Sequence, residues 1–108
     1  METPMISFLQ QYLRINSAQP NPDYESACAL FQAQAEEDDF LYQKIVLPSG
    51  KPVVVITHEG TDSSLPSLIL NHHMDVVPAL NKEQWIADPF GGCIIDNIIG
   101  CSKPGLER

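Results

Sequence analysis

Positive charge is scarce in this chain. Its 108 residues include 6 Lys and Arg against 14 Asp and Glu, so the formal net charge at pH 7 is −8. A surface that neutralises phosphate groups needs clustered Lys and Arg side chains. We therefore expect neither nucleic acid nor an anionic membrane surface as a partner. The acidic run at residues 36–39 is most simply a solvated connection.

Cysteine and long apolar runs are also scarce. Cys28, Cys93 and Cys101 are odd in number and lack Cys-x-x-Cys spacing, so they predict neither a disulfide framework nor a zinc site. No apolar run approaches the length of a membrane span, and the N-terminus carries no secretory signal pattern. These features favour a reducing, cytoplasmic location. Glycine-rich phosphate loops and the Gly-x-Ser-x-Gly nucleophile motif are absent from the sequence.

The first forty residues predict two helices. Thr3 followed by Pro4 is a typical helix start, and a helical apolar stripe continues to residue 13. Two prolines in residues 16–22 predict a loop. A second helix is expected from about residue 23 to about residue 37. One face of that helix would carry Tyr24, Ala27, Cys28, Phe31 and Ala35.

The pattern then changes to the period of β-strands. Residues 41–47 and 53–57 flank a turn at 48–51 and predict a hairpin. Residues 65–71 predict a third strand that is apolar on both faces, as in the middle of a covered sheet. The expected fold class is therefore α/β: two helices, a β-hairpin and a buried central strand. Ligand sites in such sheets lie beyond the carboxyl ends of the strands.

His73 and Asp75 follow this third strand directly. Side chains two residues apart in a strand project to the same side. The carboxylate of Asp75 would then accept a hydrogen bond from one ring nitrogen of His73 and leave the other nitrogen for a metal. The spacing alone fits a metal-free, hydrogen-bonded histidine at least as well. His72 should point away from His73, and His58 is equally compatible with the surface.

Two further positions have plain structural interpretations. Asp88 before Pro89 is typical of a turn, and Trp85 and Phe90 are typical of side chains that fill a core.

Taken in chain order, several segments resemble the aminoacylase branch of the dizinc metallohydrolases, a family that also includes acetylornithine deacetylase. The matching segments are residues 8–15, 19–24, 70–78, Trp85 and 88–90. The resemblance implies that residues 1–108 are the truncated N-terminal portion of a zinc-peptidase-like catalytic domain. It also implies a zinc-ligand role for His73 and a catalytic, histidine-supporting role for Asp75, in a complete site with two Zn²⁺ ions. One departure from the family pattern is His72, which stands where a small polar residue is usual.

The end of the chain departs further from the family. A Gly-Arg-Gly-x-x-Asp segment that supplies the metal-bridging aspartate is expected after residue 100, but the atypical tail at about 101–108 contains no aspartate. The family's general base and remaining ligands would lie further on.

The resemblance implies hydrolysis of small-molecule N-acyl-L-amino acids to a carboxylate and a free L-amino acid, by a full-length homodimer. We expect the isolated chain to be inactive. A non-catalytic truncated isoform or regulatory fragment, and a dizinc dipeptidase or acetylornithine deacetylase, remain open as alternatives.

Overall fold

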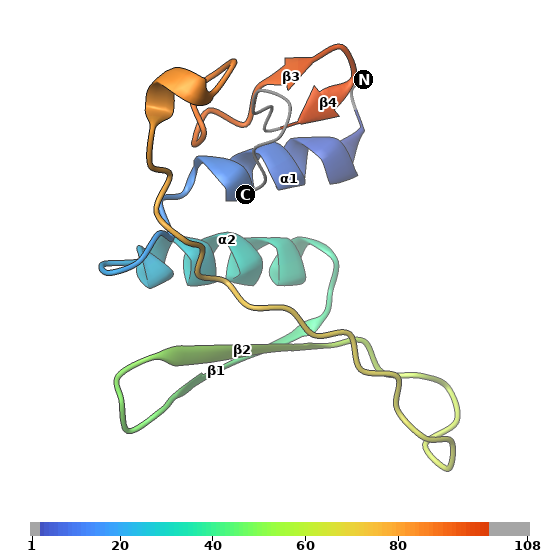
Figure 1. The fold of residues 1–108 in the computed structure, drawn as a ribbon. Helices are drawn as coiled ribbons and strands as arrows, with labels where there is room; N and C mark the ends of the chain where they lie inside the picture. The colour runs from blue at the N-terminus through green and yellow to red at the C-terminus, as the bar shows by residue number, and fades with distance from the viewer. Residues whose placement is uncertain (1–2, 100–108) are drawn as a thin grey trace. The chain divides into compact units, whose positions relative to one another are not determined.

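The computed structural model describes residues 3–99 (Figure 1). The chain forms two compact units. The central unit comprises Tyr24–Met74, and the terminal unit comprises the residues before and after it, up to Asp23 and from Asp75 on. No helix within residues 3–99 is long and apolar enough to cross a membrane.

The terminal unit begins with α1 (Pro4–Arg14). Thr3 is its N-cap, because its side-chain oxygen accepts a hydrogen bond from the amide of Ile6 at 3.2 Å. Pro4 opens the first turn, where a missing amide hydrogen costs nothing. The helix ends as Ile15 turns to an extended conformation. The predicted helix start is therefore confirmed.

A glycine pair packs against α1 inside this unit. The side-chain amide of Gln10 donates to the carbonyl oxygen of Gly92 at 2.8 Å, and the guanidinium of Arg14 donates to that of Gly91 at 3.0 Å. Gly92 has φ +61°, and a Cβ atom there would lie 2.7 Å from the carbonyl oxygen of Gln10. Both the backbone conformation and the close approach therefore require glycine at position 92.

Three short elements complete the described part of the terminal unit. The 3-10 helix η1 spans Lys82–Gln84, and β3 (Ile94–Ile95) pairs antiparallel with β4 (Ile98–Ile99). The turn between the strands consists of Asp96 and Asn97, both with positive φ. This is the two-residue hairpin chemistry that the right-handed strand twist favours.

The central unit contains α2 (Tyr24–Glu37) and a hairpin of β1 (Leu41–Val46) and β2 (Pro52–Thr57) (Figure 1). The strands pair antiparallel, with Leu41 opposite Thr57 and Val46 opposite Pro52. Gly50, at φ +84°, closes the turn. Both the second helix and the hairpin were predicted from the sequence, and their bounds differ from the expected ones by a residue or so.

Small side chains make up the buried part of the central unit. Ala27, Cys28 and Ala35 of α2 are buried, as the predicted helix face requires. The hydroxyl of Tyr42 on β1 donates to the carbonyl oxygen of Cys28 at 3.3 Å. Burial of this phenol, reinforced by the neighbouring Cys28, raises the pKa of Tyr42. No large side chain among residues 3–99 is fully buried.

The predicted buried central strand at residues 65–71 is wrong. The chain there is irregular, and Leu68, Ile69 and Leu70 are 88%, 80% and 89% exposed. A strand exists only where a neighbour completes its hydrogen-bonded ladder, and neither sheet within residues 3–99 includes this segment. Figure 1 draws it in yellow as a thin coil without an arrow.

The turn that opens this segment is held locally. The amide and hydroxyl of Ser64 both donate to the carboxylate of Asp62, at 3.0 and 2.6 Å. These bonds lower the pKa of Asp62.

Alanine in place of glycine at three positions should destabilise the protein to different extents. The loss of stability should follow the backbone strain and the atoms that the new Cβ meets. Gly92→Ala should destabilise the protein most, because the left-handed backbone alone costs about 1–3 kcal/mol and the new Cβ also meets backbone. Gly50→Ala carries the positive φ but meets nothing within 4 Å, so its loss should be smaller. Gly60→Ala has neither penalty. Urea unfolding midpoints measure the order, and equal midpoints for Gly92→Ala and Gly60→Ala would contradict it.

The exposed apolar segment should make the protein associate at high concentration, because large contiguous apolar surfaces favour contact with other molecules. Ile69→Lys should shift sedimentation velocity profiles toward the monomer. Thr61→Lys, at another exposed position, is the control because it makes the same change in net charge. Both substitutions reduce the negative charge and its repulsion, so a monomer recovered only with Ile69→Lys would identify the apolar surface as the cause. Identical profiles for the two variants would contradict the expectation.

Candidate functional site

His73 and Asp75 lie in irregular chain on either side of the division between the two units. His73 is exposed in the central unit, and Asp75 is half-buried in the terminal unit. We expected both side chains to project to one side because of strand alternation. That argument fails here, since residues 65–73 form no strand.

Asp75 is held within its own unit by Gln19. The side-chain amide of Gln19 donates to Oδ2 of Asp75 at 2.9 Å. The backbone reinforces this contact through a parallel bridge between Ala18 and Val76. In that bridge the amide of Gln19 donates to the carbonyl oxygen of Val76 at 2.9 Å, and the amide of Val76 donates to that of Ser17 at 3.0 Å.

Sequence reasoning missed the role of Gln19. It treated residues 16–22 as a connecting loop, on the strength of the prolines. The contact joins positions 56 residues apart, and no periodicity or motif links them. The nearest available signal was that Gln19 begins one of the segments matched to the family.

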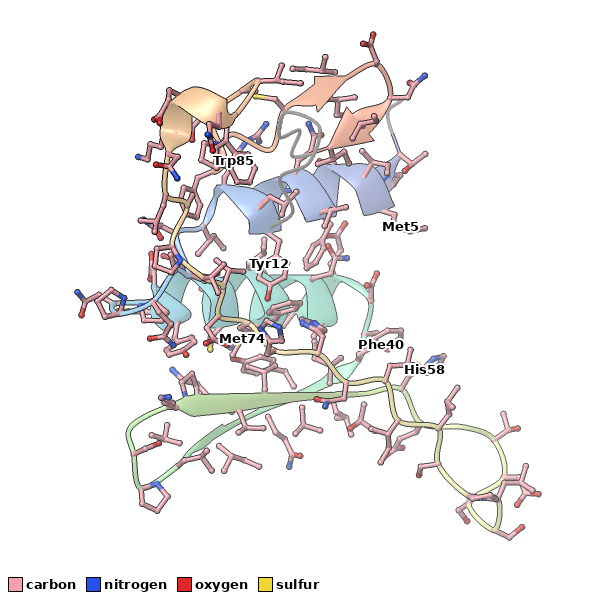
Figure 2. All side chains as sticks on the ribbon, in the orientation of Figure 1. Met5, Tyr12, Phe40, His58, Met74 and Trp85 are labelled. Atoms are coloured by element: carbon pink, nitrogen blue, oxygen red, sulfur yellow. The ribbon has the colours of Figure 1, made fainter. Side chains whose placement is uncertain are left out.

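The other two histidines contact aromatic rings in the central unit. The ring centroids of His72 and Phe31 lie 6.0 Å apart. Nδ1 of His72 lies 3.0 Å from the carbonyl oxygen of His73, and the tautomer of His72 that is protonated on Nδ1 donates a hydrogen bond to that oxygen. His58 stacks on Phe40 with the ring centroids 4.6 Å apart (Figure 2). Both rings thus have local packing partners.

The residues around Asp88 follow the plain structural interpretation. The amide of Phe90 donates to the carboxylate of Asp88 at 2.9 Å, and the amide of Gly91 donates to the backbone carbonyl oxygen of Asp88 at 2.9 Å. The predicted turn is therefore confirmed. Pro89 is buried, whereas Trp85 and Phe90 are half-buried, so the two aromatic side chains fill less of a core than expected.

The donors in the described structure do not fit a complete metal site. Residues 3–99 contain no group of three or more His, Cys, Asp or Glu side chains arranged to hold a metal ion. Catalytic zinc needs about three protein ligands and an open position. Cys28 is buried and Cys93 is exposed, and Cys101 lies outside the described residues. A zinc role for His73 therefore remains a prediction from the resemblance.

No family model matches the chain. Comparison with curated proteins shows 45% identity over 89 residues to aminoacylase-1 of Mus musculus, covering 82% of this chain and 22% of that protein. Aminoacylase-1 of Sus scrofa is 43% identical over 91 residues, covering 84% of this chain and 22% of its own length. A probable carboxypeptidase S-like 2 of Dictyostelium discoideum is 41% identical over 46 residues, covering 43% of this chain and 9% of that protein.

The matched region includes both candidate residues. A match of 89 residues in a chain of 108 must include residues 20–89, and hence His73 and Asp75. The chain nevertheless spans only about a fifth of the length of the relatives it matches. With identities of 43–45% over most of its residues, this chain is similar to aminoacylase-1 over about a fifth of that protein's length.

Proposed function

We propose that this chain contributes to an amide-hydrolysing site of the aminoacylase type. The complete protein would add water to the amide carbonyl of an N-acyl-L-amino acid and break the C–N bond. The products would be a carboxylate and an L-amino acid whose nitrogen takes up a proton. The observation that carries this proposal is the similarity to aminoacylase-1 across a region that includes His73 and Asp75.

Within that site we assign a metal-ligand role to His73 and a supporting role to Asp75. An accessible imidazole is suited to binding a metal, and His73 is exposed. A half-buried carboxylate that is already held by a neighbour is suited to orienting such a histidine, and Asp75 has such a neighbour in Gln19. We propose a pair of Zn²⁺ ions as the cofactor of the complete site. The donors in residues 3–99 do not complete the coordination of these ions.

We place residues 1–108 in the N-terminal portion of the complete protein's catalytic domain, and we propose that the full-length protein is a cytoplasmic homodimer. Residues beyond this chain would supply the general base and the other metal ligands.

A peptidase activity is the second candidate. The shorter match to a probable carboxypeptidase S-like protein favours it, because peptide and N-acyl amino acid hydrolysis both break an amide bond. A full-length protein that releases amino acids from dipeptides faster than from N-acetylmethionine would support this candidate over the aminoacylase.

The isolated chain should not hydrolyse N-acetylmethionine above the rate with zinc alone. One histidine and one aspartate provide neither a set of three ligands nor a general base. Detection of free amine in the presence of zinc measures this rate, with full-length mouse aminoacylase-1 as the positive control. Sustained turnover that disappears with His73→Ala would contradict the expectation.

Zinc should bind the isolated chain weakly, with micromolar or weaker affinity in titration calorimetry. A site with one or two ligands lacks most of the affinity of a closed four-ligand site. His73→Ala should weaken this binding further, whereas His58→Ala should change it little, because His58 stacks on Phe40. Tight one-to-one binding that survives His73→Ala would show that other side chains hold the metal.

A further inference from the structure

The backbone of the loop after α1 is held in place without the side chain of Gln19. Asn16 holds it internally: its side-chain oxygen accepts from the amide of Ala18 at 3.1 Å, and its carbonyl oxygen accepts from the amide of Asp23 at 2.9 Å. Ser17 is buried. Together with the bridge from Ser17 and Gln19 to Val76, these bonds fix the backbone on which Gln19 is carried.

The side-chain bond from Gln19 to Asp75 is additional to this frame. The two backbone bonds of the bridge involve main-chain atoms alone, so they persist with any non-proline side chain at position 19. What the side chain adds is the orientation of one carboxylate. A carboxylate side chain can occupy several staggered rotamers, and a donor at 2.9 Å favours the rotamers in which this bond forms.

The chemistry of the amide suits this task. A carboxylate offers about four lone-pair positions, so one bond from Gln19 leaves capacity for another donor such as an imidazole N–H. Arginine or lysine would also hold the carboxylate, but the positive charge of either side chain would offset the negative charge of Asp75. A neutral amide orients Asp75 and leaves that charge available.

We propose that Gln19 is a positioning residue that holds the carboxylate of Asp75 in a single orientation. The consequence for His73 rests on the proposed function, in which Asp75 supports that histidine. Gln19 itself takes no part in bond breaking.

NMR spectroscopy of the 108-residue chain, at concentrations where it is monomeric, tests this proposal directly. Two measurements apply to the wild type: the scalar coupling across the hydrogen bond from the Gln19 side-chain nitrogen to the Asp75 carboxylate carbon, and the χ1 couplings of Asp75. We expect the first to be detectable and the second to report one rotamer. Gln19→Met, which keeps the side-chain length but removes the donor, should abolish the first and change the rotamer populations that the second reports.

A matched control and a folding check accompany this variant. Gln11→Met makes the same change on α1, where the side chain of Gln11 donates to the carbonyl oxygen of Ser7, and should leave Asp75 unchanged. The coupling across the backbone bond from Gln19 to Val76 should persist in Gln19→Met and shows that the loop is intact. If methionine disturbs the loop, Gln19→Asn, whose amide is one methylene shorter, should give the same change in the Asp75 rotamer populations.

The tautomer of neutral His73, read from its ring-nitrogen chemical shifts, separates this proposal from the proposed function. Asp75→Asn and Gln19→Met should both shift the tautomer ratio. A shift with Asp75→Asn alone would overturn the positioning role and leave the proposed function standing. No shift with either variant would overturn the support of His73 by Asp75, while the rotamer measurement would still decide whether Gln19 holds Asp75. An Asp75 side chain whose rotamer populations are the same in Gln19→Met as in the wild type overturns the proposal.

Discussion

The parallel bridge between Ala18 and Val76 is the constraint on which the terminal unit depends. It joins the loop after α1 to a segment more than fifty residues later, and closing so long a loop costs conformational entropy that local contacts do not repay. Several hydrogen bonds together offset that cost. They are the two backbone bonds of the bridge, the side-chain bond of Gln19, and the bonds from Gln10 and Arg14 to the glycine pair. Each of these contacts links α1 or its following loop to residues after position 74.

Local chemistry explains what the sequence predicted correctly. The cap of Thr3, the hairpin turn at Gly50 and the turn at Asp88 all depend on residues within a few positions of each other. Propensity and capping act over that range, so the elements that they define are readable in a single sequence. The hairpin turn of Asp96 and Asn97 was readable in the same way, as two turn-forming residues between pairs of isoleucine, but the sequence analysis did not identify it.

Contacts between distant residues were not readable. Nothing in the spacing of Gln19 and Asp75 indicates their bond, and nothing around Gly92 indicates that its Cα lies against Gln10. The prediction of a central strand is wrong for a related reason. The sequence shows the apolar run at residues 68–70, but a strand also needs a hydrogen-bonded neighbour, which residues 3–99 do not provide. For the candidate site, recognition of the aminoacylase resemblance is confirmed by the matched relatives, whereas the roles of His73 and Asp75 stay predictions.

The surroundings of Asp75 and His73 differ. Asp75 is oriented by contacts inside the terminal unit. His73 is exposed and follows an apolar segment that has no ladder. Any strand that paired with residues 65–71 would cover exposed leucine and isoleucine side chains, each worth about 1.5–3 kcal/mol when fully buried.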